Sequence, residues 1–452
     1  MSVVFKVNNM KRSVVIKTGL IGTGLIVLLS SWLVNATQEK VWRNNNNTAI
    51  GAKQNKNSAV VQQLLAELDA RLHDNPKDYE ASLLKGLFYF KQGDFNRAVK
   101  LLRQLTHRAP EFHLAHLVYG DLLLAQVGVV TDVGKSPIFK DLDNKMSKQL
   151  AQLREEAQFR LQANLNRLHE TRIPRQLLKL GRSVDKAILV EKSTHRLYVY
   201  ERQADLKPPL KVYDYYVSTG RKDGNKNAQG DLRTPEGVYF VTKYIPDNKL
   251  PDKYGVGAFP VSYPNEWDRH LGKTGEGIWL HGTASDFYSR PPRDSEGCVV
   301  LTNIDLGFIQ REIKPGITPV IIANRLDWVD YKVWRQEQKN LLAVIDRWRR
   351  DWESLDVNRY LSNYAKDFWT RGYNFTSWSQ RKIRLAVNKK FQKVKISDLS
   401  LFVYPVAGDG GREMAVARFH QQYRSNNYQS DTNKRLYLTH DKDEWRILYE
   451  GS

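Results

Sequence analysis

Apolar and polar residues follow three successive patterns along this chain, and the first pattern is helical. From Ala59 onward, apolar residues recur at the spacing i, i+3, i+4, i+7, at positions 60, 61, 64, 65, 68 and 72. This spacing is typical of an amphipathic helix. It returns between Ser147 and Leu168. The pattern therefore predicts an α-helical region over residues 59–170.

A repeat lies inside this helical region. Pro76 and Pro110 are 34 positions apart, and Gly86 and Ala98 between them are small where two paired helices must approach closely. The unit resembles a tetratricopeptide repeat. This resemblance allows two interpretations, a surface that binds partner proteins or a helical spacer that positions the rest of the chain.

Two histidines in the same region are spaced as metal ligands can be. His113 and His116 stand at i, i+3 on a helix that we expect to run to Gln126. No carboxylate or thiol falls at a matching spacing. We therefore interpret both histidines as part of an ordinary helix surface.

Short strand-like runs separated by Gly, Pro and Asn replace the helical pattern between Ile188 and Ala323. Such runs predict a mainly-β sandwich or barrel. The polar run over residues 221–230 lacks the Gly-Lys-Ser/Thr ending of a phosphate-binding loop, so we interpret it as a hairpin loop.

Beyond Trp328 the pattern changes again. Leu341–Trp352 has helical spacing, and we expect the helix to continue over residues 360–368. Four strand-like runs follow, at residues 395–403, 414–425, 434–439 and 445–449. Helices followed by an antiparallel meander predict an α+β domain.

The aromatic residues of this last region resemble those of the nuclear-transport-factor-like (SnoaL-like) cone fold. The matching positions are Trp352, Asp356, Tyr364, Phe368 and Trp445. The resemblance covers residues 335–452 and implies a cone that encloses a pocket for a substrate or a partner. We find no convergent His/Asp pair in it that argues for a second enzyme.

The N-terminus has the pattern of an export segment. Four basic residues, Lys6, Lys11, Arg12 and Lys17, precede an apolar run over residues 19–34. The run is shorter than the ~20 residues of a comfortable membrane span. We expect residues 1–36 to be a signal peptide or an N-terminal inner-membrane anchor, followed by a linker over 37–58. Either places the remainder in the periplasm or cell envelope.

Composition agrees with an exported multidomain protein. The chain has 452 residues, of which 41% are hydrophobic, and this length favours about three domains. A formal net charge of +21 could attract nucleic acid, anionic lipid or an acidic polymer. We recognise no nucleic-acid-binding module, so we expect no nucleic acid partner and favour a basic surface that faces anionic envelope material.

Cys298 is the only cysteine of the chain, so it cannot form an internal disulfide. A strand-like run over residues 275–281 ends at His281, and a second run over 298–301 begins at Cys298. A thiolate beside an imidazole, with a lowered pKa, is a common nucleophile. The alternative is a buried cysteine that acts as a small hydrophobe.

Two motifs resemble the active-site signature of L,D-transpeptidase (YkuD-type) catalytic domains. They are Trp-Leu-His-Gly-Thr at 279–283 and Ser-Glu-Gly-Cys at 295–298. Ser-Thr-Gly at 218–220 and Thr-Pro-Glu-Gly at 234–237 resemble further elements of that family. The resemblance covers residues 183–325. It implies a mainly-β catalytic domain that needs no metal and no cofactor.

The resemblance also implies roles for individual residues. Cys298 is expected to be the nucleophile, His281 the base, and Gly282 the residue whose carbonyl group orients the imidazole. Backbone N–H groups near Gly297 and Cys298 are expected to hold the oxyanion. The substrate or oxyanion positions are Gly297, Ser295 and Trp279.

The implied substrate is a peptidoglycan stem peptide, attacked at the diaminoacyl-D-alanine bond through a thioester. An amine acceptor gives transpeptidation, and water gives L,D-carboxypeptidation. Members with a cone domain resemble cell-shape L,D-carboxypeptidases, while others attach or release envelope lipoproteins. A non-catalytic envelope scaffold and an ordinary cysteine protease are also compatible with a chain of this kind. Retention of both His281 and Cys298 argues against the scaffold, and nothing resembles papain-type surroundings.

This sequence departs from the family pattern at two positions. Many members carry His or Arg at 296 and Arg or Asn at 300, whereas this chain has Glu296 and Val300. If both positions face a second stem peptide, they bind its carboxylate poorly. We therefore expect water or a different amine to resolve the thioester, with tripeptide and free D-alanine as the main products.

Overall fold

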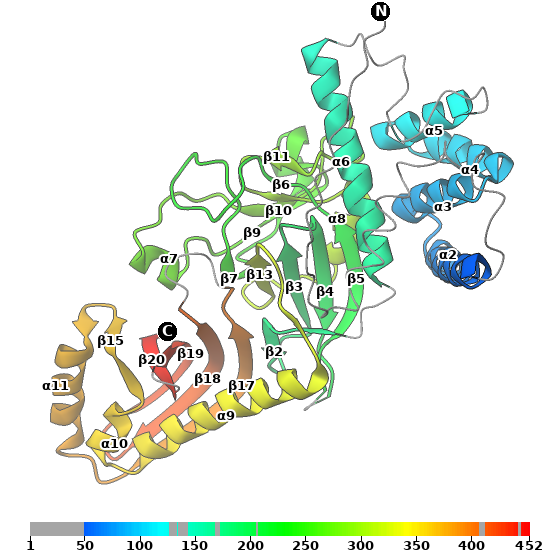
Figure 1. Cartoon of the computed structure of the whole chain (residues 1–452). Helices are drawn as coiled ribbons and strands as arrows, with labels where there is room; N and C mark the ends of the chain where they lie inside the picture. The colour runs from blue at the N-terminus through cyan, green and yellow to red at the C-terminus, as the bar shows by residue number, and fades with distance from the viewer. Residues whose placement is uncertain are drawn as a thin grey trace, which may run out of the picture.

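The computed structural model describes residues 49–125, 133, 143–167, 172–204, 207–405, 412–441 and 444–452. Helices come first, a mainly-β region follows, and an α+β region ends the chain (Figure 1). The predicted fold class is confirmed in this respect. Among the described residues, no helix has the length and apolar character of a membrane span. The expected signal or anchor segment, residues 1–36, lies outside these residues.

The N-terminal helices form what we call the helical module. Its described members are α2 (Ala49–Asp74), α3 (Tyr79–Lys91), α4 (Phe95–Arg108), α5 (His113–Ala125) and α6 (Asn144–Arg167). α3 and α4 pack closely because Gly86 has no side chain, and an added Cβ would lie 2.8 Å from Leu102 Cγ. α2 begins inside the segment that we expected to be a linker, since Ala, Lys and Gln favour helix even without an apolar stripe.

Two sheets build the central region. The first has the strand order β5–β4–β3–β13–β7 and the second β12–β10–β9–β8. The first comprises Leu210–Tyr216, Arg196–Glu201, Lys186–Glu191, Pro319–Ala323 and Gly237–Phe240. The second comprises Val299–Val300, Trp279–His281, Gly257–Pro260 and Ile245–Pro246.

Smaller elements complete the central region. β6 (Thr219–Gly220) pairs with β11 (Arg293–Ser295), and β1 (Ile173–Pro174) pairs with β14 (Trp328–Val329). The helices are α7 (Glu266–His270), α8 (Asn303–Gln310) and the short 3₁₀ turns η2 (Asp247–Lys249) and η3 (Asp252–Tyr254).

The first sheet is covered on both faces, which explains the unbroken apolar run of β3. Ile188 and Val190 point into a core that includes Phe259 of the second sheet. Ala187 and Leu189 point into the opposite core, shared with the C-terminal sheet. Successive side chains of a strand face opposite sides, so a strand between two layers needs apolar residues throughout.

The C-terminal region is a curved sheet with the long helix α9 (Tyr331–Glu353) along it (Figure 1). Its strand order is β16–β15–β20–β19–β18–β17–β2. These strands are Tyr373–Asn374, Tyr364–Thr370, Glu444–Gly451, Gln429–Asp441, Met414–Ser425, Gln392–Val403 and Leu177–Lys179. The remaining helices are α10 (Val357–Leu361) and α11 (Phe375–Ala386).

The expected helix over residues 360–368 is wrong. α10 ends at Leu361, and β15 begins at Tyr364 and pairs in parallel with β20. The aromatic spacing of this segment suits a helix face, but Tyr364 and Phe368 are buried by the strand pairing and the core beside it. Pairing with a strand some eighty residues later in the chain, as between Tyr364 and Ile447, overrides the local spacing.

The central and C-terminal regions share structure. β2 precedes the two central sheets in sequence yet pairs with β17 of the C-terminal sheet. Arg435 Nη1 lies 2.7 Å from the Glu266 carboxylate, and Asn265 Nδ2 donates to the Tyr404 hydroxyl at 3.0 Å. A common hydrophobic core and these polar contacts join the two regions.

Candidate active site

Two parallel strands place the residues of the two motifs together. β10 pairs with β12 so that Leu280 faces Val299 and His281 faces Val300. Leu280 and Val299 point into the hydrophobic core. By strand alternation, Trp279, His281 and the residue before β12, Cys298, belong to the opposite face. The structure therefore brings the predicted base and nucleophile to one face of adjacent strands.

The imidazole of His281 is buried and has a defined partner. Its Nδ1 lies 2.7 Å from the Gly282 carbonyl oxygen, and the ring contacts Tyr254 edge-on with centroids 5.0 Å apart. Because a carbonyl oxygen only accepts hydrogen bonds, Nδ1 carries the proton and the Nε2 lone pair is left to accept one. Burial lowers the pKa of His281 from its usual 6.5 to about 4, so the ring is neutral near pH 7.

Gly282 must lack a side chain at this position. An added Cβ would lie 2.1 Å from Asn303 Oδ1. That oxygen accepts the Thr283 N–H at 3.1 Å and the Val256 N–H at 3.2 Å. Asn303 therefore ties the backbone just after the base to the segment before β9, and Gly282 leaves room for its amide.

Cys298 is partly exposed, and its thiol points toward backbone groups of β10 and the preceding segment. Sγ donates to the Gly277 carbonyl oxygen at 3.4 Å. Burial raises the pKa of the thiol above its usual value, although the Trp279 N–H and the charges of Arg290 and Lys253 act in the opposite direction. The expected lowering of the thiol pKa is therefore not seen, because desolvation outweighs the nearby cations.

The turn before the thiol depends on Gly297 and Ser295. Gly297 has φ 126°, and an added Cβ would lie 2.7 Å from the Arg233 carbonyl oxygen. The Ser295 hydroxyl accepts the Gly297 N–H at 3.1 Å and donates to the Cys298 carbonyl at 2.6 Å. The Gly297 N–H, expected to hold the oxyanion, is thus hydrogen-bonded within the turn. Ser295 positions the backbone around the nucleophile.

Two cations beside the site were not predicted from the sequence. Arg290 Nη2 donates to the Lys253 carbonyl oxygen at 3.4 Å, and the Lys253 ammonium lies 4.9 Å from the centre of the Tyr254 ring. The positive charges of Arg290 and Lys253 act on both His281 and Cys298. Arg290 could have been suspected from the sequence, because it lies between the two motifs. Lys253 belongs to a different segment, and nothing in the sequence pointed to it.

The two positions that depart from the family pattern differ in exposure. Glu296 is exposed, and its charge contributes to raising the thiol pKa. Val300 is 3% exposed within β12. The Val300 side chain is thus enclosed by the protein on the face that also carries its partner His281, and the expectation that it faces a second stem peptide stays a prediction.

The C-terminal region contains a cavity of about 620 Å³. Lys382 lies beside it, with its ammonium 4.3 Å from the Trp378 ring centre and 4.9 Å from that of Trp352. Burial lowers the pKa of Lys382 to about 8. The C-terminal region thus has an open pocket of ligand size with a cation among aromatic rings.

The two histidines considered as possible metal ligands, His113 and His116, make other contacts. His116 Nε2 lies 3.0 Å from the Pro110 carbonyl oxygen, and His113 packs edge-on against Phe287. Within the described part of the chain, no group of three His, Cys, Asp or Glu side chains is arranged to hold a metal ion.

Comparison with known families matches two segments. Residues 185–322 match the L,D-transpeptidase catalytic domain (YkuD), and residues 340–451 match the Cds6 C-terminal NTF2-like domain. The putative L,D-transpeptidase YafK of Escherichia coli K12 is 33% identical over 126 residues, covering 27% of this chain and 44% of YafK. The match thus spans less than half of that relative's length.

Two solved structures are similar over most of their own length. Bd1075 of Bdellovibrio bacteriovorus is 29% identical with a TM-score of 0.54, covering 62% of this chain and 97% of that one. The helical cell shape determining protein Pgp2 of Campylobacter jejuni is 28% identical with a TM-score of 0.52, covering 61% and 95%. The chain thus contains an L,D-transpeptidase catalytic domain (YkuD) and a C-terminal NTF2-like domain, and it is similar to the cell-shape protein Pgp2.

Proposed function

We propose that this protein acts on peptidoglycan stem peptides at the diaminoacyl-D-alanine bond, with Cys298 as nucleophile and His281 as base. The observation that carries the proposal is the contact between His281 Nδ1 and the Gly282 carbonyl oxygen at 2.7 Å, which selects the tautomer of the ring. Its Nδ1 is committed to the Gly282 carbonyl, which leaves Nε2 able to take the thiol proton. The neighbouring strand places Cys298 on the same face.

The reaction proceeds from a neutral thiol and a neutral imidazole. Nε2 takes the Cys298 proton as sulfur attacks the carbonyl carbon at the L-centre of the substrate bond. The protonated imidazole then gives its proton to the leaving amine of D-alanine as the carbon–nitrogen bond breaks. The thioester that remains is attacked by water or an amine, with His281 again taking the proton.

The cations beside the thiol suit the substrate's charge. The terminal D-alanine of a stem peptide carries a carboxylate, and Arg290 and Lys253 supply positive charge at the reacting pair. An Arg side chain binds carboxylates well through its paired N–H groups. We assign these two residues to substrate binding, a role in which Arg290 is the stronger candidate because it is partly buried while Lys253 is exposed.

Water is the proposed acceptor. Glu296 is exposed beside the nucleophile and repels the carboxylates of a second stem peptide, so tripeptide and D-alanine should exceed cross-linked dimer.

We place the enzyme in the periplasm or cell envelope. An N-terminal inner-membrane anchor, and binding of envelope proteins by the helical module or the cone domain, stay predictions.

Mass spectrometry of muropeptides tests the proposal. Purified disaccharide-tetrapeptides are incubated with the wild type and with Cys298→Ser, and the products are separated and weighed. Tripeptide plus D-alanine in the wild type alone supports carboxypeptidation, and directly cross-linked dimer indicates transpeptidation. Release of a lipoprotein from sacculi without trimming would instead favour an amidase-type action on envelope lipoproteins. If none of these assays yielded a product, the enzymatic assignment would be contradicted.

A further inference from the structure

The segment between the proposed base and nucleophile packs against the helical module. We call residues 284–292 the connecting loop, because they join His281 to Cys298. The ring of Tyr288 in this loop lies 4.2 Å from that of Phe112 and 5.7 Å from that of Tyr79. Tyr288 is a buried member of the module's own hydrophobic core. The loop thus completes the core of another region.

Polar contacts fix the same loop to the module. The Tyr288 N–H donates to the Glu111 carbonyl oxygen at 3.2 Å, and the Ser289 hydroxyl donates to Glu156 at 2.7 Å. Just beyond the loop, Arg293 pairs with Glu155. Backbone, hydroxyl and charged groups therefore hold the loop from the α4–α5 turn and from α6.

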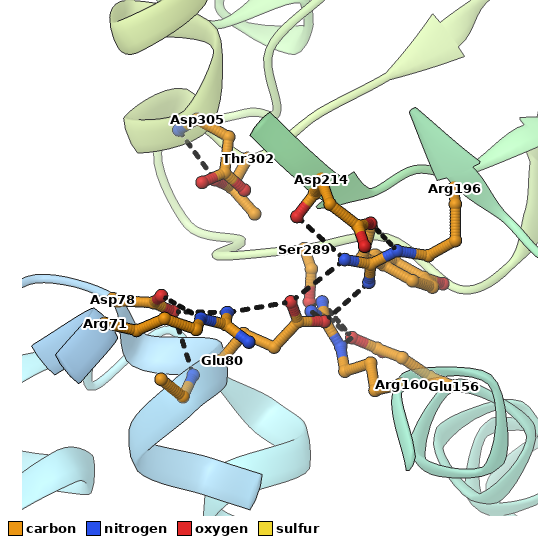
Figure 2. Close-up of polar contacts among 12 residues, drawn as sticks. Arg71, Asp78, Glu80, Glu156, Arg160, Arg196, Asp214, Ser289, Thr302 and Asp305 are labelled. Carbon is orange, nitrogen blue, oxygen red and sulfur yellow. Dashed lines mark hydrogen bonds and ion pairs between the residues drawn. The ribbon is translucent and has the colours of Figure 1, made fainter. Parts of the chain in front are cut away.

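A buried ion network seats the module on the catalytic sheet. Figure 2 shows Glu80 of α3 pointing between Arg160 of α6 and Arg196 of β4. Glu80 lies 2.8 Å from Arg160 and 2.9 Å from Arg196, and Arg196 pairs with Asp214 at 2.6 Å. Both arginines are 2% exposed. Buried charges with this many partners allow one relative placement of module and sheet.

The network continues to Arg290. The Arg160 guanidinium lies 4.0 Å from the centre of the Tyr216 ring. The Tyr216 hydroxyl donates to the Arg290 carbonyl oxygen at 3.0 Å. Arg290 also follows Ser289 directly in sequence. Contacts with the module therefore hold the backbone of Arg290, whose side-chain charge acts on His281 and Cys298.

We propose that the helical module is a structural part of the active site: by holding Tyr288 and Ser289 it positions Arg290 to bind the substrate's carboxylate beside Cys298. The inference rests on the proposed function, in which Cys298 is the nucleophile. Neither matched family segment includes the module. Tyr288, Ser289, Phe112 and Glu156 are positioning residues, since they act through Arg290.

Alkylation of Cys298 by two reagents tests the proposal without requiring turnover. Iodoacetate is anionic and iodoacetamide is neutral, so the ratio of their rates reports the positive charge at the thiol. Because Cys298 is the only cysteine, all thiol labelling occurs there, and peptide mass spectrometry reads the rate at that residue. Tyr288→Ala should lower the iodoacetate/iodoacetamide ratio about fivefold, the effect of one opposite charge at about 4 Å in water. It should also raise the KM for tetrapeptide more than it lowers kcat.

Further variants separate positioning from general damage. Arg290→Gln should lower the ratio to the same extent, and adding Tyr288→Ala to it should change little more. Ser289→Ala removes one hydrogen bond without opening a cavity and should lower the ratio in the same direction. Phe95→Ala is the matched control, because it removes an exposed aromatic ring of the module that packs on Phe90, and it should leave the ratio unchanged.

The outcomes distinguish this inference from the proposed function. An unchanged ratio in both Tyr288→Ala and Ser289→Ala, with circular dichroism like the wild type, would overturn the positioning role and leave the enzymatic assignment standing. A lowered ratio supports the positioning role even if no tetrapeptide is cleaved, since alkylation needs no substrate.

Discussion

His281 Nδ1 lies 2.7 Å from the carbonyl oxygen of its neighbour Gly282. Because the two residues are adjacent, the local backbone conformation alone determines this contact. It fixes the orientation of the imidazole without a carboxylate partner. In triads built on Asp, a negative charge stabilises the imidazolium that forms. A carbonyl group does so less strongly, and burial further favours the neutral ring. This site therefore begins from neutral partners and transfers the proton during attack.

The neutral imidazole predicts the pH dependence of turnover. The pKa of His281 is lowered to about 4 by burial, so the base stays able to accept a proton down to that pH. We expect kcat/KM to fall on the acid side through about pH 4, well below the usual 6.5 of histidine. Steady-state D-alanine release, followed from below about pH 4 to about pH 8, measures this, with stability checked at each pH. An acid limb near the usual histidine pKa would mean that His281 is not held in the neutral form.

Replacing the thiol should abolish the reaction. Cys298→Ser puts a hydroxyl beside a neutral imidazole, and we expect turnover to fall about a thousandfold or more, as for loss of other nucleophiles that act as a unit with a base. The variant should keep the circular dichroism and melting temperature of the wild type, since the side chains are nearly isosteric. More than a few percent of residual activity would argue against the nucleophile assignment.

Gly297→Ala should impair both folding and catalysis. Its φ of 126° is unfavourable for a side chain, and the new Cβ would meet the Arg233 carbonyl oxygen at 2.7 Å. We expect a loss of about 1–3 kcal/mol of stability, and about a hundredfold in kcat if the thiol moves by about 1 Å. Gly307→Ala in α8 is the control, because its Cβ would meet nothing within 4 Å. Equal behaviour of the two variants would contradict this account.

Glu80 should make the module's docking sensitive to acid. Burial opposes its charged form, but Arg196, Arg160 and Arg71 outweigh burial and hold the pKa far below the usual 4.5. A lowered pKa means that the stabilisation is complete above about pH 4.5 and is lost as the pH falls below it. Glu80→Gln should cost about 3–5 kcal/mol, since it leaves buried arginines with fewer partners.

Urea unfolding and limited proteolysis of the helical module at neutral pH measure this cost. Asp69→Asn provides the control, because Asp69 pairs with Lys85 in the same module while 57% of its side chain is exposed. That variant should cost about 1 kcal/mol or less. If Glu80→Gln were as mild as the control, the network would not hold the module in place.

Positions 296 and 300 should respond differently to arginine. Val300 is buried, so Val300→Arg encloses a charge and should destabilise the protein by on the order of 3–5 kcal/mol, seen as a lower melting temperature. Glu296 is exposed, so Glu296→Arg should leave stability unchanged and raise the share of cross-linked dimer among the muropeptide products. If Glu296→Arg gave the same share of cross-linked dimer as the wild type, the argument for water as acceptor would be removed.

The sequence by itself was sufficient for the order of the regions and for the two motifs. Helical spacing, short strands and the final meander are local properties of a few successive residues, and they predicted the fold class correctly. The lone cysteine and the histidine of the Trp-Leu-His-Gly motif were likewise identified from their neighbours in sequence, and the structure brings them to adjacent strands. Side-chain periodicity records which face is covered, and that information is present in the chain itself.

Only the tertiary structure decided what depends on residues far apart. β15 formed a strand because β20 pairs with it, and Val300 proved to be buried. Lys253 and Arg290 came together beside the thiol from two separate segments. The raised thiol pKa and the docking of the helical module by Glu80, Arg160 and Arg196 arose in the same way. Strand partners, desolvation and Coulomb interactions depend on distances in space, and a one-dimensional pattern does not contain these distances.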